Sequence, residues 1–358
     1  MQALTRQRGW LSLLRLLADE DTNNQVLAAQ LETVYNLDVT LMEPGEGCYT
    51  VFTREGVFQL YHTEQPKETI AILQCWDYLQ GQGLAGLGTL RVTSSGDLGF
   101  YFNDQLTYMS TRAVGRRGEL SLKEDGVRIA SVLAELHLLS QQLPLSLQEG
   151  VERSNPIEPA LIPKRQELNL FRIMALNRLY PKAFDLFYLE IYDHLAGLLH
   201  CSVDLLTEIG IHDLETDPKL VGLLQGNCHG RMFRVTDDGK VQLPNLKKST
   251  WGLLALDVAA LLGNINEYAE GSLAIAQGVL AAYQAIRPLC RAELGLIYGL
   301  GIFPEGVWEA AYDYYKGSRK LDEPEAMETL RREWGQATDR QEYWQRLLGD
   351  ELGYEDSN

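Results

Sequence analysis

The sequence predicts an α+β protein in two lobes, a small antiparallel-sheet lobe and a larger, mainly helical lobe. Short alternating apolar runs between turn signals fill the first third of the chain, and apolar residues at helical spacing fill the rest. With 358 residues, the chain is longer than one hydrophobic core usually supports. We expect an N-terminal helical segment over 1–36, a sheet lobe with one helix over 37–112, and a helical lobe over 113–358 with an embedded hairpin over 233–245.

Composition indicates a globular protein with an acidic surface. Hydrophobic residues make up 45% and charged residues 23% of the chain, and the formal net charge is -17. A field of that sign repels nucleic acid and anionic lipid, so the partners that we expect are proteins, with a small-molecule ligand left open. The apolar run from Trp10 to Leu17 is interrupted by Ser12 and Arg15. It is too short to span a bilayer, and we expect a cytoplasmic protein without a membrane span.

The predicted sheet lobe has five strands and one helix. Residues 49–53 and 57–62 flank a turn at Arg54, Glu55 and Gly56, and residues 66–80 carry apolar residues at helical spacing before Gly81. Three further strands are expected over 89–93, 98–102 and 106–110, the last two joined by a turn at Asn103 and Asp104. A connector with Gly115, Arg116, Arg117 and Gly118 follows.

The helical lobe is interrupted by one hairpin. Residues 233–235 and 240–243 flank the turn Thr236-Asp237-Asp238-Gly239, which has the composition of a hairpin turn. The predicted helices cover 123–140, 164–177, 181–200, 251–262 and 272–287, and more amphipathic helix follows Pro304.

Cysteine and histidine spacing argues against a metal site. The five cysteines and six histidines are scattered, with no C-x-x-C pair. His194 and His200 lack the i,i+4 spacing that places two ligands on one helical face. We therefore expect neither a metal nor a cofactor.

Four stretches of the chain match, in order, motifs that occur together in one group of proteins. Residues 47–61 resemble the strand-turn-strand that ends in a phosphate-binding lysine, and Cys228-His229-Gly230 resembles the start of the catalytic loop. Residues 237–245 resemble the strand pair that leads to a metal-binding Asp, and 251–257 the helix after it. In this order, the four stretches together resemble the aminoglycoside phosphotransferases and the kinase-like superfamily, most closely the CotS-type spore-coat family. This resemblance implies a bilobal protein-kinase-like fold.

The same resemblance implies that the charged residues of phosphoryl transfer are missing. Phosphoryl transfer needs a lysine on the phosphates, Mg²⁺ ligands and a carboxylate that orients the acceptor hydroxyl. The lysine position holds Tyr61, the catalytic Asp position holds Arg231, and the metal-binding position holds Asn245. No catalytic residue is therefore assigned, and Gly45, Gly47, Tyr61, His229 and Asn245 are expected to line only a vestigial cleft.

Asp257 is predicted to have a structural role. It is the only charged residue from Trp251 to Leu262, and an unpaired carboxylate on so apolar a segment would be costly. We expect it to accept hydrogen bonds from a nearby backbone loop.

Two main hypotheses of function follow, beside a third in which the interlobe cleft is a sensor that binds a ligand without turnover. In the first, the chain is a catalytically inactive kinase-like protein that acts as a binding or structural module, in a spore coat if the family resemblance holds. In the second, it is a small-molecule phosphotransferase or nucleotide-using enzyme with a rebuilt site. A docking body needs an exposed apolar or aromatic patch, for which Trp308, Tyr312, Tyr314 and Tyr315 are candidates. These four could equally pack in the core of a terminal helix.

Overall fold

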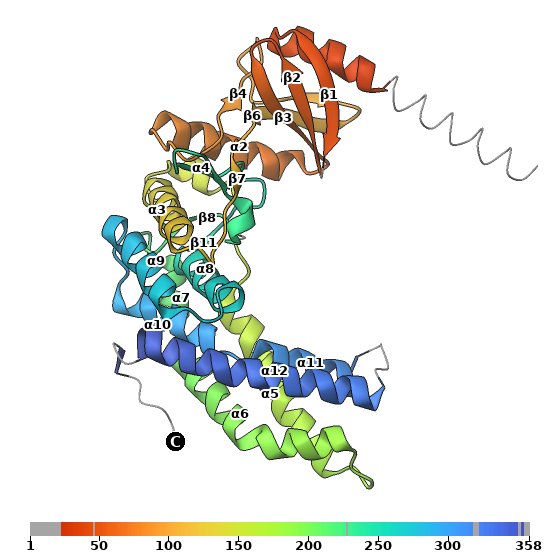
Figure 1. The fold of residues 1–358 in the computed structure, drawn as a ribbon, viewed down its shortest axis with the longest axis vertical. Helices are drawn as coiled ribbons and strands as arrows, with labels where there is room; N and C mark the ends of the chain where they lie inside the picture. The colour runs from red at the N-terminus through yellow and green to blue at the C-terminus, as the bar shows by residue number, and fades with distance from the viewer. Residues whose placement is uncertain (1–22, 46, 227, 318–321, 350–351, 354–358) are drawn as a thin grey trace, which may run out of the picture. The chain divides into compact units, whose positions relative to one another are not determined.

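The computed structural model describes residues 23–45, 47–226, 228–317, 322–349 and 352–353 (Figure 1). The chain divides into two compact units. The first, the sheet unit, comprises Met1–Gly115, Pro144–Val151 and Gln242–Lys247. The second, the helical unit, comprises Arg116–Leu143, Glu152–Val241 and Lys248–Asn358. The lobe limits expected from the sequence, at 37 and 113, stay predictions.

The sheet unit is built on a six-stranded antiparallel sheet in the order β1-β2-β3-β6-β4, with β5 paired to β6. Residues 23–35 form a helix before β1, and α4 (Leu145–Gln148) lies later in the chain. The other elements are β1 (Val39–Gly45), β2 (Cys48–Thr53), β3 (Gly56–Thr63), α2 (Pro66–Gly81), β4 (Leu90–Arg91), β5 (Phe100–Phe102) and β6 (Gln105–Thr111).

The two hairpins that turn chemistry predicted in this unit are confirmed. Strands β2 and β3 pair with Thr53 opposite Gly56, on either side of the expected turn. Strands β5 and β6 are joined through Asn103 and Asp104, whose φ angles of 49° and 62° are both positive. Two successive positive φ angles are the requirement of the tight turn that best matches strand twist, and Asn and Asp tolerate them.

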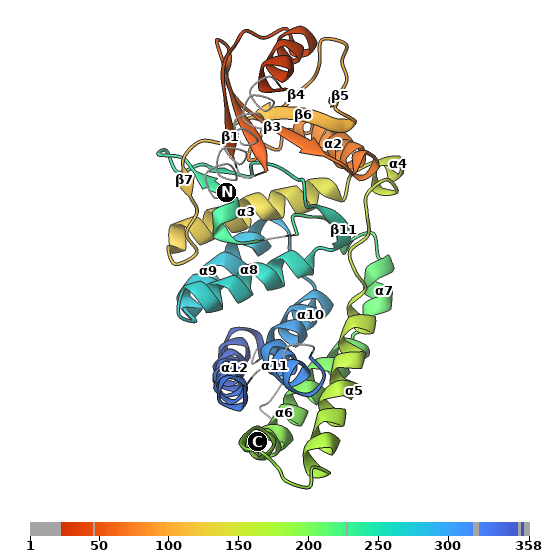
Figure 2. The same ribbon diagram turned by 90° about the vertical axis from the view of Figure 1, so that its right-hand side faces the viewer.

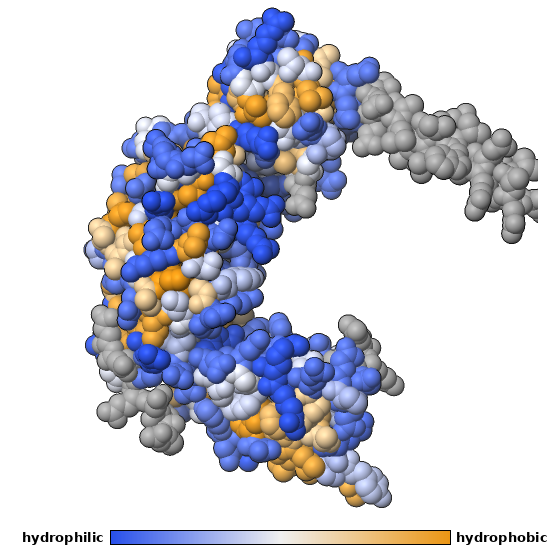
Figure 3. Space-filling view, in the orientation of Figure 1, coloured by the Kyte–Doolittle hydropathy of each residue, from blue (hydrophilic) through white to orange (hydrophobic). Residues whose placement is uncertain are grey.

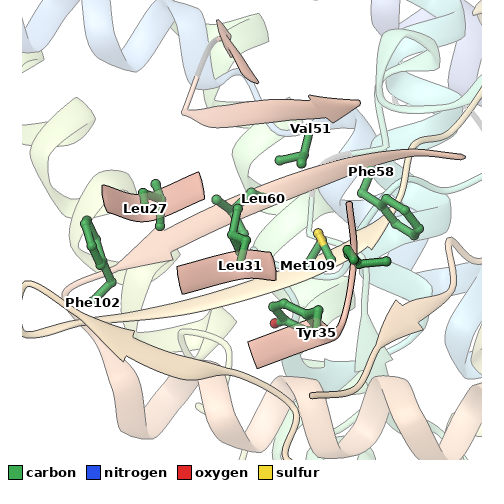
Figure 4. Close-up of a cluster of buried hydrophobic side chains, with 9 residues drawn as sticks. Leu27, Leu31, Tyr35, Val51, Phe58, Leu60, Phe102 and Met109 are labelled. Carbon is green, nitrogen blue, oxygen red and sulfur yellow. The ribbon is translucent and has the colours of Figure 1, made fainter. Parts of the chain in front are cut away.

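One hydrophobic core lies between the 23–35 helix and the sheet (Figure 4). The helix contributes Leu27, Leu31 and Tyr35, spaced four residues apart on one face, and all three are at most 2% exposed. Across from them lie Leu37, Val51, Phe58, Leu60, Phe102 and Met109. Helix and sheet thus each bury one apolar face against the other.

The helical unit contains nine α-helices among its described residues. In both views α3, α8 and α9 lie side by side (Figure 2). The helices are α3 (Lys123–Ser140), α5 (Ile157–Leu176), α6 (Ala183–Glu208), α7 (Ile211–Thr216), α8 (Ala255–Tyr268), α9 (Leu273–Ile286), α10 (Arg291–Ile302), α11 (Glu305–Tyr315) and α12 (Glu323–Trp344).

Short strands and turns interrupt these helices. The predicted hairpin is present as β9 (Arg234–Val235) and β10 (Val241–Gln242), and β7 (Arg116–Arg117) pairs with β9 where only a connector was expected. Strand β8 (Val221–Leu224), which the sequence analysis missed, pairs with β11 (Thr250–Leu253). Two single-turn elements, η1 (Gly230–Met232) and η2 (Gln345–Gly349), complete the unit.

The prediction of one helix over 251–262 is wrong at its start. Trp251 and Leu253 lie in β11, with alternate residues buried, and the helix begins only at Ala255. Gly252 is opposite Gly222 in the ribbon, and an added Cβ would lie 2.1 Å from the Ser154 hydroxyl. This close approach requires glycine, a tertiary constraint that apolar spacing alone does not reveal.

Several other helices and strands begin or end at residues different from those predicted. Helix α5 begins at Ile157, not at 164, α6 runs from Ala183 to Glu208, not over 181–200, and α3 has the predicted limits. The strands predicted over 89–93 and 98–102 shorten to β4 and β5. Of the helix predicted over 1–36, residues 1–22 lie outside the described residues. None of the helices in the described part of the chain is long and apolar enough to cross a membrane.

Candidate functional site

Tyr61, at the position that the resemblance assigns to lysine, is buried in the central strand β3. It is opposite Tyr108 of β6, and the two rings stack with 5.1 Å between their centroids. The Tyr61 hydroxyl donates to Gln59 Oε1 at 3.3 Å. Burial raises the pKa of Tyr61, although a hydrogen bond with Asn245 opposes this shift. Tyr61 is therefore a neutral phenol at pH 7.

Asn245, at the position assigned to the metal-binding Asp, contacts Tyr61. Its amide nitrogen donates to the Tyr61 hydroxyl at 3.5 Å, and its amide oxygen accepts from the backbone N–H of Lys247 at 3.1 Å. The preceding loop is held by a hydrogen bond from Gly88 N–H to Leu243 O. Sequence positions 61 and 245 thus come together within the sheet unit, as an uncharged pair.

Gln59 extends this contact into a row of neutral polar side chains. Its amide oxygen also accepts from the Cys48 thiol at 3.4 Å, and its amide nitrogen donates to the Thr50 hydroxyl at 3.4 Å. Burial raises the pKa of Cys48, and the positive charges of Lys247 and Arg112 act against that shift. The cations that act on this row, Lys247 and Arg112, are exposed, whereas the side chains of the row itself are buried or half-buried and carry no charge.

Gly45 and Gly47, expected to line the vestigial cleft, belong to the β1–β2 hairpin. Gly45 pairs with Cys48 at the end of the ladder, and Gly47 has a φ of +71°. A positive φ favours glycine, so a strand-connecting turn accounts for Gly47 without any phosphate. These residues give no separate support for a nucleotide site.

His229 and Arg231 lie in the helical unit, around η1. The His229 ring is 6.0 Å from the ring of Tyr268 in an edge-on contact, and Arg231 is exposed. Gly230 packs so closely on Gly118 that an added Cβ would lie 2.8 Å from its carbonyl oxygen. Close packing thus explains why position 230 is glycine. The side chain that follows, Arg231, is positively charged.

Asp257 of α8 is the charged residue around which the buried part of the helical unit is organised. It is 3% exposed and accepts hydrogen bonds from the backbone N–H groups of Gln225 at 2.6 Å and Gly226 at 3.1 Å. Its carboxylate also lies 3.1 Å from Nε2 of the fully buried His137. Its assignment as structural rather than catalytic stays a prediction, but the backbone partners are of the expected kind.

The contacts of Asp257 continue through α3, α9 and α10. His137 Nδ1 lies 2.7 Å from the Tyr283 hydroxyl, to which Arg287 Nη1 donates at 3.3 Å. Arg287 then forms a buried ion pair with Glu293 at 2.8 Å. Burial lowers the pKa of His137, although Asp257 opposes this, so His137 is neutral near pH 7. We call these five residues the Asp257 network.

Sequence reasoning missed four members of this network, although one signal was present. His137 falls in the middle of an apolar stretch of a strongly predicted helix, where a polar side chain needs a partner. Its partners come from residues more than a hundred positions away, so spacing along the chain could not identify them.

A cavity of about 1030 Å³ lies beside His229 within the helical unit. Four exposed carboxylates lie at its wall: Glu267 on α8, Glu270 in the turn after α8, and Asp339 and Glu342 on α12. Arg340 and Trp344 also line it, and among the described residues Arg340 Nη2 and Trp344 Nε1 are buried without a hydrogen-bond partner. Of these lining residues, the sequence had singled out only His229.

The aromatic residues considered for a docking patch are all half-buried and contact neighbouring side chains. Tyr314 stacks on Phe184 with centroids 3.8 Å apart, and Tyr315 stacks on Phe171 at 5.2 Å. Trp308 is half-buried and donates its indole N–H to Glu167 at 2.9 Å. These contacts are of the kind that the core-packing alternative expects, although none of the four side chains is fully buried.

Positions 61 and 245 carry neutral side chains, whereas phosphoryl transfer relies on charged groups. In the sheet unit, positions 61 and 245 supply a phenol and an amide, neither of which neutralises a phosphate. An amide oxygen is a poorer ligand for a hard cation than a carboxylate. No group of three His, Cys, Asp or Glu side chains that could hold a metal occurs in the described part of the chain.

Comparison with known proteins identifies the fold. No protein-family model matches the sequence, and no curated protein matches it. The structure is similar to the crystal structure of an aminoglycoside phosphotransferase from Alicyclobacillus acidocaldarius, with a TM-score of 0.72 and 17% identity over 90% of this chain and 95% of that one. A spectinomycin phosphotransferase in complex with ADP and spectinomycin gives a TM-score of 0.57 at 14% identity, over 88% and 98% of the chains. The predicted kinase-like fold is thus confirmed, while the spore-coat likeness and the loss of activity stay predictions.

Proposed function

We propose that this chain is a catalytically inactive kinase-like protein that acts by binding. The observation that carries the proposal is the contact between Tyr61 and Asn245, which occupy the positions of the phosphate-binding lysine and the metal-binding Asp. In a phosphotransferase these positions hold opposite charges that act on Mg²⁺ and nucleotide phosphates. Here the two neutral groups are hydrogen-bonded to each other, Tyr61 also donates to Gln59, and Asn245 accepts from the Lys247 N–H.

The residue after His-Gly supports the same conclusion. A carboxylate at that position orients the acceptor hydroxyl, whereas Arg231 has the opposite charge and cannot accept its proton. No Asp or Asn occurs between His229 and Thr236. A small shift in the alignment of the loop therefore restores neither residue.

The biological setting that we propose follows from the resemblance alone. The CotS-type likeness suggests a cytoplasmic protein that docks onto other proteins, with the coat of a bacterial endospore as its destination. The acidic surface, with a net charge of -17, favours basic proteins as partners.

A second candidate function is a small-molecule enzyme with a rebuilt site. The observation in its favour is the cavity beside His229, whose wall combines an imidazole with four carboxylates. Imidazole and carboxylate groups are the usual general acids and bases of enzymes. This candidate requires turnover of a ligand in the cavity, which the first one does not.

Thermal unfolding with ATP, ADP and GTP, each with and without Mg²⁺ or Mn²⁺, tests the first proposal. A nucleotide at a hundred times its dissociation constant stabilises the native state by about 2.7 kcal/mol, which shifts the midpoint visibly. We expect no shift with any nucleotide. A metal-dependent shift together with release of ADP would overturn the proposal and favour the enzyme.

A further inference from the structure

An exposed apolar face lies at the end of the helical unit, where α5 and α6 are connected. Eighteen large hydrophobic side chains are exposed in the described part of the chain, and seven of them fall within residues 170–186. Figure 3 shows apolar residues gathered over this end, at the place of α6 and the connection in Figure 1. We call the seven the α5–α6 face: Leu170, Ile173, Met174, Leu176, Leu179, Tyr180 and Leu186.

Helix α5 is apolar on two opposite sides near this face. Phe171 and Ala175 are at most 2% exposed and lie on the packed side of the helix. Leu170, Ile173 and Met174, at the i, i+3, i+4 spacing of one helical side, point to solvent instead. A helix with apolar residues all round is normally covered on both sides, so the second side of α5 lacks its cover in the single chain.

The most exposed residues lie in the connection. Leu179 and Tyr180 are 83% and 81% exposed, more than any other large hydrophobic side chain described. With about 200 Å² for each fully exposed large side chain, the seven residues expose on the order of 800 Å². This exceeds the largest apolar patch of a typical monomer and equals what one partner contributes to a standard interface.

Charged residues of both signs lie beside the face, and Arg172 and Asp193 both act on Tyr192 of α6. Arg172 lies next to Ile173 on α5, with its guanidinium over the Tyr192 ring. Glu190 and Asp193 follow Leu186 at i+4 and i+7, on the same exposed side of α6. The α5 edge of the face is thus basic and the α6 edge acidic.

We propose that the α5–α6 face joins two copies of this chain in a two-fold dimer, with α5 of each copy against α6 of the other. A two-fold interface is self-complementary, so each basic edge meets an acidic edge twice. A lipid surface fits less well, because the acidic α6 edge and the net charge of -17 oppose approach to anionic headgroups. This inference is independent of the proposed function, since it uses no residue of the candidate site.

Sedimentation velocity of the full chain over a range of concentrations, up to about 100 µM, tests the dimer. We expect a monomer–dimer equilibrium in the wild type. The double variant Ile173→Asp/Leu179→Asp should be a monomer throughout, because two carboxylates would be buried without partners. Leu145→Asp, at a 66% exposed leucine outside the face, is the matched control and should dimerise like the wild type.

Charge reversal distinguishes a second copy from any other occupant. Arg172→Glu and Glu190→Arg should each raise the dimer dissociation constant about tenfold, and the two together in one chain should restore it. Circular dichroism checks that every variant is folded. A wild type that stays monomeric, or one that binds anionic vesicles through this face without dimerising, would overturn the proposal. Failure of the double reversal to restore the dimer would overturn the arrangement of α5 against α6.

Discussion

The Tyr61–Asn245 contact is made of neutral polar groups, whereas the Asp257 network keeps charged groups buried. In the sheet unit, the positions that the sequence resemblance assigns to a lysine and a metal-binding Asp hold a phenol and an amide, joined by a 3.5 Å hydrogen bond. In the helical unit, full charges stay buried, with Asp257 and Glu293 at most 3% exposed. Each of these carboxylates has a cation, an imidazole or backbone N–H groups as partners.

The difference shows which electrostatic interactions the fold itself requires. Asp257 fixes the backbone at Gln225 and Gly226 and ties α3 to α8, so its charge stabilises the structure whether or not a ligand binds. A buried lysine at position 61 would have had use only with a phosphate or a carboxylate beside it. At a buried position without such a partner, a neutral pair is the less costly choice.

The largest effect is expected from Asp257→Ala. The substitution leaves two buried backbone N–H groups and His137 without their acceptor, and breaking a buried interaction of this kind costs about 3–5 kcal/mol. Urea unfolding followed by circular dichroism measures the loss. Glu267→Ala, on the exposed side of the same helix, is the matched control, with a change within about 0.5 kcal/mol. A loss below about 1 kcal/mol for Asp257→Ala would show that the network is dispensable.

The second effect comes from restoring charge to the neutral pair. Tyr61→Lys places an ammonium at a position that is only 5% exposed, so we expect a loss of about 2 kcal/mol or more. Adding Asn245→Asp supplies a counter-ion within reach and should return about 1–3 kcal/mol as coupling between contacting residues. The unfolding free energies of the wild type, the two single variants and the double variant measure this coupling energy.

A matched cycle checks that the coupling is local. Asn103→Asp, in the exposed β5–β6 turn of the same unit, adds the same carboxylate away from position 61. Its coupling with Tyr61→Lys should be within about 0.5 kcal/mol of zero. Equal coupling in the two cycles would mean that residues 61 and 245 do not interact.

The third effect is a pH dependence from His137. Its folded pKa lies below the usual value of about 6.5, because the imidazole is buried and kept neutral. The unfolded chain therefore binds a proton that the native chain does not, and stability falls as pH drops below about 6.5. This residue adds up to about 1.4 kcal/mol per pH unit to the slope. The facing groups are Asp257, Tyr283, Arg287 and Glu293.

Comparison of variants isolates this contribution from that of the many carboxylates. His137→Gln should be less stable at pH 7 but should have a shallower slope between pH 6.5 and 5 than the wild type. The control is His194→Gln, at an exposed histidine that contacts Gln341, and it should leave the slope unchanged. Parallel curves for wild type and His137→Gln would contradict a neutral, buried His137.

The sequence predicted the parts of the fold that local chemistry determines. Turns at Arg54–Gly56 and Asn103–Asp104, and the limits of α3, follow from residues next to one another. Strand β8 was missed and β11 was taken for helix, because their pairing depends on contact between Gly222 and Gly252 across the ribbon. Apolar spacing alone cannot distinguish a buried strand from a buried helix when the run is short.

The same distinction holds for the site. Positions 61, 231 and 245 were found through a family pattern, and the structure adds that 61 and 245 touch. The cavity beside His229 was not foreseen, since α8 and α12 contribute residues about seventy positions apart. Neither helix shows, by itself, that its exposed carboxylates share a wall.

The smallest effect is expected from Tyr61→Phe. The change keeps the ring and its stacking on Tyr108 but removes the hydroxyl that bonds to Gln59 and Asn245. These hydrogen bonds are long, at 3.3 and 3.5 Å, so we expect a loss of about 0.5–1 kcal/mol, toward the low end for neutral pairs. Tyr101→Phe, at a 56% exposed tyrosine of the same unit, should change the unfolding free energy by less than about 0.3 kcal/mol. If Tyr61→Phe were stabilising, burial of the Tyr61 hydroxyl would cost more than its hydrogen bonds return. The neutral pair would then contribute nothing to holding β3 against the loop at Asn245.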